Sequence, residues 1–111
     1  MKLAEIIDRL SLDVFVSASD MNGVVAGGYC GDLLSHVLAK ASPGDLWITI
    51  QHHANVVAVA QVAGLQAVLI ADGRSPNEET LQRAQEGGIA LLGTAKSAFE
   101  ISGDLHCLLV R

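Results

Sequence analysis

From residue 24 onward, short apolar segments typical of strands alternate with amphipathic segments typical of helices. We expect strands at 24–26, 46–50, 66–71 and 89–92, and helices at 32–41, 55–63 and 75–86 between them. A short helix at 2–10 and a strand at 13–17 come first. Alternation at this spacing is typical of βαβ crossovers. The sequence therefore predicts an α/β fold, with a mostly parallel β-sheet and flanking helices.

Turn residues and helix-capping residues indicate where these elements begin and end. In the segment SPNE at 75–78, Ser75 is expected to cap a helix, the following proline to occupy its first position, and Glu78 to complete the capping box. Thr94 is expected to cap a last short helix that ends near Gly103. Residues 105–110 are then expected to form an edge strand.

Length and composition narrow the class of protein. The chain has 111 residues, which predicts a single domain over residues 1–111. A net charge of −5 without a basic stripe argues against nucleic-acid binding. The longest weakly polar stretch, 56–71, is shorter than a membrane span requires. The two cysteines form no CxxC pair, so we expect free thiols and a cytoplasmic protein.

Polar and glycine residues follow the predicted strands, and in open α/β sheets ligands bind outside the carboxyl ends of the strands. We therefore expect the loops after the four predicted parallel strands to share one functional edge. The candidate ligand-binding residues on this edge are Gly27, Gly28, Cys30, Gly31, Asp32, Gln51, His52, His53, Asn55, Asp72, Arg74 and Thr94.

The segment GGYCGD at 27–32 leads into a predicted helix, where free N–H groups and glycines favour an anion. Its spacing matches neither common glycine motif for phosphates, so we favour a tight turn with Asp32 as helix cap. His52 and His53 also precede a helix, whose N-terminus favours neutral imidazole. Side chains adjacent in extended chain point in opposite directions, so we expect at most one histidine to face a given site.

Arg74 is the one cation on the predicted edge, where a guanidinium suits a phosphate or carboxylate; the alternative is a solvated turn residue. Cys30 is either a reactive thiol beside a helix N-terminus or a small buried residue. No His or Cys pair has the short spacing of a structural zinc site, so we predict no metal site. Trp47 is expected in the core or at a dimer interface.

The segments GDLLSHVLAKASPGDLWIT, NVVAVA and PNEETLQRAQEGGIALLGT resemble a DRTGG domain, and the similarity extends from about Gly27 to Gly103. The resemblance implies a small α/β fold like the N-terminal domain of HPr kinase/phosphorylase. DRTGG domains accompany CBS pairs in some pyrophosphatases, and stand-alone members occur near iron-only hydrogenase genes. The resemblance therefore implies a regulatory or interaction role, self-association, and a link to adenine nucleotides.

The chain lacks the two motifs that give the family its name. The Asp-Arg step would fall near Gln51–His53, and the Thr-Gly-Gly near Asp72-Gly73. We therefore carry over fold and association, but no catalytic residue.

Our first hypothesis is a non-catalytic regulatory or interaction module, a homodimer with the apolar segment 56–62 as candidate interface. It would take a small anionic ligand such as an adenine nucleotide, or a protein partner. The alternative is a redox- or metal-linked accessory protein that uses Cys30 with His52 or His53, for which the resemblance implies an association with hydrogenases.

Overall fold

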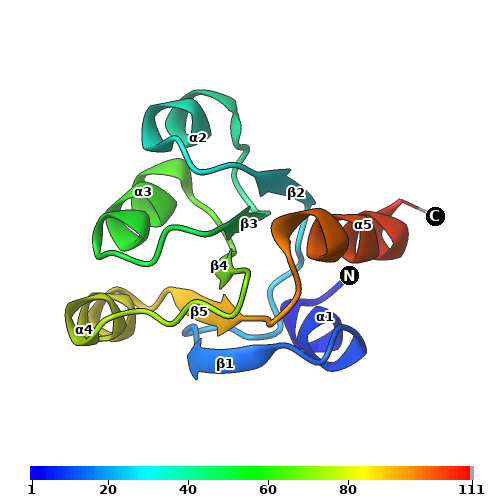
Figure 1. Ribbon diagram of the computed structural model, residues 1–111, viewed down its shortest axis with the longest axis horizontal. Coiled ribbons are helices and arrows are strands. Elements are labelled where there is room, and N and C mark those ends of the chain that lie inside the picture. Colours follow the sequence, from blue (N-terminus) through cyan, green and yellow to red (C-terminus); the bar gives the residue numbers. More distant parts are fainter. Residues whose placement is uncertain (111) are drawn as a thin grey trace.

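The computed structural model describes residues 1–110 and contains a five-stranded sheet with helices on both faces (Figure 1). The strands are β1 (Asp13–Val16), β2 (Gly27–Cys30), β3 (Asp45–Thr49), β4 (Ala67–Ile70) and β5 (Ala90–Gly93). The helices are α1 (Leu3–Arg9), α2 (Leu34–Lys40), α3 (Asn55–Ala63), α4 (Glu78–Gly87) and α5 (Ala98–Leu109). The predicted α/β class with a mostly parallel sheet is confirmed.

The strand order is β1-β5-β4-β3-β2, so each parallel strand pairs with the next one along the chain. β1 closes the sheet on the other side by pairing antiparallel with β5. The helices that connect parallel strands, α2, α3 and α4, cover one face, and α1 and α5 cover the other (Figure 1). The carboxyl ends of β2, β3, β4 and β5 therefore lie along one edge, as the sequence predicted.

Two apolar layers fill the space between the sheet and its helices. Leu46 and Ile48 of β3 point toward α1 and α5, whereas Trp47 between them packs on the side of α2, α3 and α4. Trp47 is fully buried, and its indole Nε1 donates to the carbonyl of Gly31 at 2.8 Å. It is a core residue. No helix within residues 1–110 combines the length and the apolar character needed to span a membrane.

The valine-rich segment forms helix α3, as predicted, and ends at Gly64 in the left-handed conformation. Val56, Val57 and Val59 are buried against the sheet, and only Val62 of the four valines is exposed. The prediction that segment 56–62 forms a dimer interface is therefore wrong for most of its side chains. These side chains already pack in the core of this domain.

The strand expected at 24–26 lies instead at Gly27–Cys30, within the segment expected to be a loop. Val25 packs against the N-terminal segment, and its N–H donates to the carbonyl of Met1 at 2.9 Å. Gly28 is placed in the strand because α5 passes close to it: a Cβ there would lie 3.0 Å from Cδ2 of Leu105. The glycines thus allow helix packing rather than a phosphate-binding turn.

Helix α4 begins later than expected, because Asn77 rather than Ser75 caps it by accepting from the N–H of Thr80. Its end at Gly87-Gly88 is confirmed, with Gly88 in the left-handed conformation.

The C-terminal segment is a single helix, α5, so both the short helix ending at Gly103 and the strand at 105–110 are wrong. Ser97, not Thr94, caps it, through a capping box with Glu100. Gly103 lies inside the helix with an ordinary backbone angle and open space around it.

Candidate functional site

The polar residues at the β2–β3 end of the carboxyl edge bond one another. Asp32 Oδ1 accepts from Thr49 Oγ1 at 2.8 Å and from the N–H of Ile50 at 2.9 Å. Gln51 Nε2 donates to the carbonyl of Asp32 at 3.2 Å. Asp32 is therefore not the helix cap we expected: α2 begins at Leu34, and Asp32 ties the loop after β2 to the end of β3.

The two histidines lie next to this cluster. Their rings are 4.4 Å apart and inclined by 32°, because the chain bends at His53 instead of continuing as a strand. The expectation that they point in opposite directions is therefore wrong. The carbonyl of His52 accepts from Oγ1 of the buried Thr80 at 3.0 Å, a contact that the sequence did not indicate. His53 and Asn55 are exposed at the start of α3.

The β4–β5 end of the edge is different, because the chain leaves these two neighbouring strands on opposite faces. The loop after β4 leads to α4, and the loop after β5 leads to α5. Such a divergence opens a crevice between the strand ends, which is where ligands bind in open α/β sheets. Backbone bonds join the two loops: Gly73 N donates to Thr94 O at 2.9 Å and Asp72 N to Lys96 O at 2.8 Å.

The turn after β4 uses the left-handed backbone conformation at two successive residues. Asp72 and Gly73 both have positive φ, at 66° and 67°. This conformation suits glycine, and aspartate is among the few other residues that adopt it readily. The turn delivers Arg74 to the crevice.

A groove of about 290 Å³ occupies this crevice. It is lined by Asp13, Phe15, Gly73, Arg74, Ser75, Thr94 and Ala95. β1 supplies the first two residues, and the ring of Phe15 lies over Gly93, where a Cβ would come within 2.5 Å of Cε2 of the ring. We call this groove the β4–β5 crevice.

The cations near the crevice differ in their partners. Lys96 Nζ donates to Asp104 Oδ2 at 2.6 Å, and this bond raises the pKa of Lys96 above its ordinary value of 10.5. Arg74 is exposed and forms no salt bridge with any residue in 1–110. The crevice therefore combines an available guanidinium, an aromatic ring, a carboxylate and hydroxyls. Across residues 1–110, no group of three or more His, Cys, Asp or Glu side chains could hold a metal ion.

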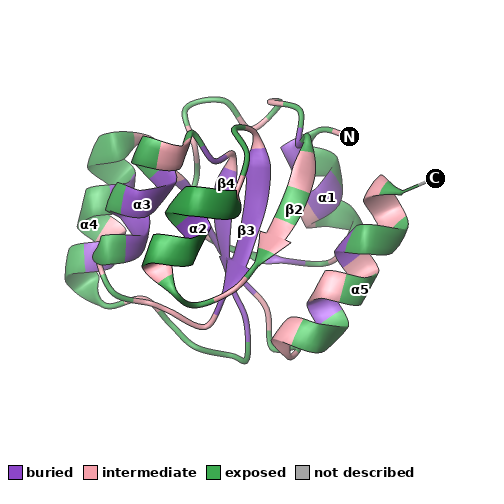
Figure 2. Cartoon of the chain, turned by 90° about the horizontal axis from the view of Figure 1, so that it is seen from above, coloured by how far each residue is buried: buried purple, intermediate pink, exposed green. Residues whose placement is uncertain are grey.

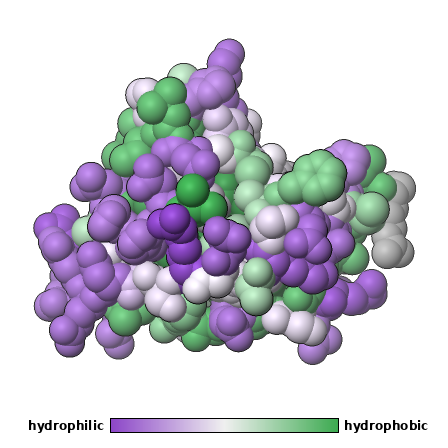
Figure 3. Space-filling model, viewed as in Figure 1, coloured by the Kyte–Doolittle hydropathy of each residue, from purple (hydrophilic) through white to green (hydrophobic). Residues whose placement is uncertain are grey.

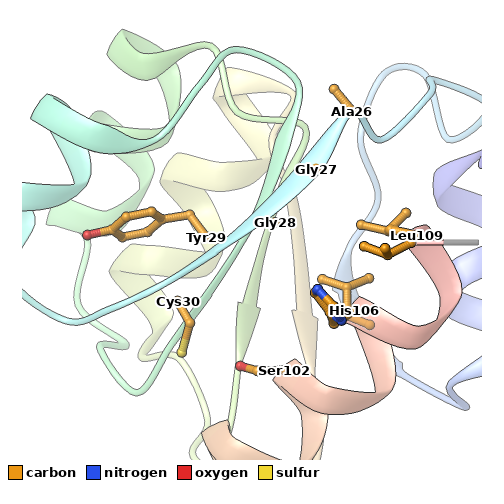
Figure 4. A pocket seen from close by; sticks show the side chains of 10 residues that line it. Ala26, Gly27, Gly28, Tyr29, Cys30, Ser102, His106 and Leu109 are labelled. Carbon is orange, nitrogen blue, oxygen red and sulfur yellow. The ribbon is translucent and has the colours of Figure 1, made fainter.

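A second groove, of about 300 Å³, runs between β2 and α5 (Figure 4). Gly27, Gly28 and Cys30 line it, together with Ser102 and His106 from α5. We call it the β2–α5 groove. Its lining includes His106 but neither His52 nor His53, so the groove does not bring Cys30 together with the histidines we expected.

The twelve predicted site residues thus divide among three places. Arg74 and Thr94 meet in the β4–β5 crevice, beside Asp72. Gly31, Asp32, Gln51, His52, His53 and Asn55 belong to the β2–β3 end, and Gly27, Gly28 and Cys30 to the β2–α5 groove. The sequence analysis missed Asp13 and Phe15, because only the sheet order brings β1 next to β5. The sequence did predict a strand at 13–17, but nothing within that segment indicates which strand it pairs with.

No protein-family model matches the sequence, and no curated protein matches it. Among solved structures, the chain is similar to the crystal structure of the CBS and DRTGG domains of the regulatory region of Clostridium perfringens pyrophosphatase, complexed with the activator diadenosine tetraphosphate. The TM-score is 0.71 at 17% sequence identity, over 94% of this chain and 45% of that chain. The chain thus spans less than half of that protein's crystallised region. The similarity confirms the DRTGG-like fold that the sequence segments indicated.

Proposed function

We propose that this chain, with its DRTGG-like fold, is a non-catalytic regulatory module that binds a small anionic ligand in the β4–β5 crevice, with an adenine nucleotide as the first candidate. The observation that carries the proposal is the position of Arg74. It is a cation without an ion-pair partner in residues 1–110, on the wall of a groove where two strand ends diverge. Arg is well suited to bind phosphate, because its planar fork of donors matches two phosphate oxygens.

The other residues of the crevice suit the remaining parts of a nucleotide. The ring of Phe15 lines the groove and is only half-buried, so it could pack against a base. The carboxylate of Asp13 accepts hydrogen bonds, as ribose hydroxyls or an exocyclic amine would require. At about 290 Å³ the groove is at the small end of ligand pockets, which favours a single nucleotide unit.

The structural neighbour supports the choice of first ligand. The regulatory region of that pyrophosphatase was crystallised with an activator that contains two adenosines. Only 45% of that chain is matched, so the position of its ligand is not carried over to this chain. The comparison supports testing adenine nucleotides before other anions.

A thermal-shift series with AMP, ADP, ATP, diadenosine tetraphosphate and inorganic phosphate tests the proposal. A ligand at one hundred times its dissociation constant adds about 2.7 kcal/mol to the unfolding free energy. For a domain of this size, we expect the midpoint to rise by roughly 10 °C.

The matched variants are Arg74→Gln and Arg83→Gln. Arg83 is also an exposed arginine, but it pairs with Glu79 on α4, away from the crevice. The proposal requires that the nucleotide-induced shift disappear in Arg74→Gln and persist in Arg83→Gln. No shift with any ligand, or a shift that Arg74→Gln leaves intact, would contradict it.

The redox-linked alternative has less support from the structure. Cys30 and Cys107 are free and exposed, which fits the cytoplasmic location we propose. However, the groove beside Cys30 is lined by His106 and not by His52 or His53. Replacement of Cys30 by serine should leave ligand binding unchanged if the module is non-catalytic.

A further inference from the structure

The β2–α5 groove lies at an outer edge of the sheet, where the strand order places β2. The neighbouring β3 is buried along its whole length, whereas the residues of β2 alternate between intermediate and exposed (Figure 2). Helix α5 contacts β2 and forms the opposite wall of the groove. The space of about 300 Å³ between strand and helix is at the small end of ligand pockets. The groove therefore has room for a small molecule.

The backbone of β2 offers hydrogen-bonding groups to this space. In a parallel pair, successive residues direct their N–H and C=O alternately toward the partner strand and away from it. The N–H of Gly31 donates to Ile48 O at 3.1 Å, so Gly31 faces β3. Cys30 and Gly28, one and three residues before it, therefore direct their N–H and C=O away from β3. The Gly28 carbonyl and the Cys30 N–H follow each other along this edge, so an acceptor and a donor are neighbours there.

The wall formed by α5 contains a hydroxyl without a partner. Within residues 1–110, Ser102 Oγ is the one buried side-chain nitrogen or oxygen that forms no hydrogen bond. Ser102 lines the groove, and Figure 4 shows its side chain extending from α5 toward the side of β2. Buried polar groups almost always have a partner, and one without a partner destabilises the fold. Because a serine side chain rotates between staggered positions, its hydroxyl can turn toward a molecule in the groove.

The rest of the lining is mostly apolar and contains no Asp, Glu, Lys or Arg. Leu105 and Leu109 of α5 and Ala26 before β2 contribute hydrocarbon surface. Figure 3 shows pale and hydrophobic side chains between α2 and α5, whereas hydrophilic side chains cover α4. An ion would lose hydration in the groove without gaining an opposite charge from such residues. The lining therefore favours an uncharged ligand with an apolar body.

We infer that the β2–α5 groove binds a small uncharged primary amide with an apolar body. The amide carbonyl accepts from the N–H of Cys30, an amide N–H donates to the carbonyl of Gly28, and the apolar body packs against Leu105 and Leu109. A primary amide has a second N–H and a second lone pair, so it can also bond the hydroxyl of Ser102. This site is additional to the nucleotide site proposed above, because the β2–α5 groove and the β4–β5 crevice share no lining residue.

An NMR titration of the full chain tests the inference, with benzamide as the probe and benzoate as a control of nearly the same shape that carries a charge. We expect benzamide to shift the backbone N–H signals of Gly28 and Cys30, with a dissociation constant of about 1–10 mM for so small a molecule. Benzoate should leave these two signals unchanged. The inference is overturned if benzamide does not shift them at concentrations up to its solubility, or if benzoate shifts them equally.

Ser102→Ala separates ligand binding from a structural role of this serine. Because one hydrogen bond to the ligand is lost, the dissociation constant of benzamide should rise roughly three- to tenfold. The midpoint of thermal unfolding without ligand should not fall, because the variant removes a buried hydroxyl that has no partner. Ser35→Ala, at an exposed serine of α2 outside the groove, should change neither quantity. Benzamide binding that is equally tight in Ser102→Ala and wild type would overturn the inference.

Discussion

The two ends of the carboxyl edge have similar residue types but differ in what those residues bond. At the β2–β3 end, Asp32 accepts from Thr49 and Ile50, and Gln51 donates back to the Asp32 carbonyl. At the β4–β5 end, Arg74 has no salt-bridge partner within residues 1–110 and lines a groove. Polar residues at a strand end therefore belong to a candidate ligand site only when their bonds are not already used within the fold.

The largest expected effect lies at the closed β2–β3 end, in Trp47→Phe. This change removes the hydrogen bond to Gly31 and leaves part of a buried site empty. We expect the unfolding free energy to fall by about 2 kcal/mol. Urea denaturation measures it, with Phe99→Ala as control, since Phe99 is 89% exposed and should give almost no change. An equal effect of the two variants would contradict the assignment of Trp47 to the core of this end.

Asp32→Ala should have the next largest effect on stability. Thr49 and the N–H of Ile50 both lose their acceptor, and we expect a loss of about 1–2 kcal/mol. Asp32→Asn keeps one acceptor oxygen and should lose about half as much. Both variants should retain any nucleotide-induced shift. If Asp32→Ala abolished that shift at unchanged stability, the β2–β3 end would be the binding site instead.

Arg74→Ala should behave in the opposite way. We expect its unfolding free energy to stay within about 0.5 kcal/mol of wild type, because an exposed side chain without a partner contributes little. Denaturation without ligand measures this value. A loss similar to that of Asp32→Ala would show that Arg74 has a structural role and would remove the contrast between the two ends.

The smallest expected effect concerns Lys96 beside the β4–β5 crevice. Its pKa is raised in the folded state by the bond to Asp104, so the protonated form is stabilised by folding. The stabilisation is present below pH 10.5 and is lost as the pH rises through the folded-state pKa. We expect only a slight drop, since exposed ion pairs contribute little. Thermal melts near this pH should show the drop in wild type and not in Asp104→Asn.

The sequence predicted most elements, because apolar periodicity and glycines identify them locally. The left-handed ends at Gly64 and Gly88 and the helical state of the valine-rich segment are examples. It failed at β2, whose glycines indicate a loop unless the approach of Leu105 from α5 is known. It also failed at α5: Gly103 predicts a helix end, but the residue lies inside a helix that begins with the capping box of Ser97 and Glu100.

The candidate site was harder to predict than the fold. Arg74 and Thr94 were identified because they follow strands. Asp13 and Phe15 were missed because their place depends on a pairing between the two ends of the chain. The bonds that occupy Asp32 depend on the distance between two strand ends, about which local sequence carries no information.

The antiparallel pairing of β1 with β5 has a consequence for the order of folding. Gly27 pairs with Asp45, Leu46 with Ala67 and Ala67 with Ala90, so each parallel contact closes a short stretch of chain. Asp13 pairs with Gly93, which closes a stretch about four times as long and costs roughly 1 kcal/mol more in chain entropy. We therefore expect the βαβ units to assemble first and β1 to dock last. The crevice that contains Phe15 would be completed late in folding and opened early in unfolding, and a ligand bound there would slow the detachment of β1.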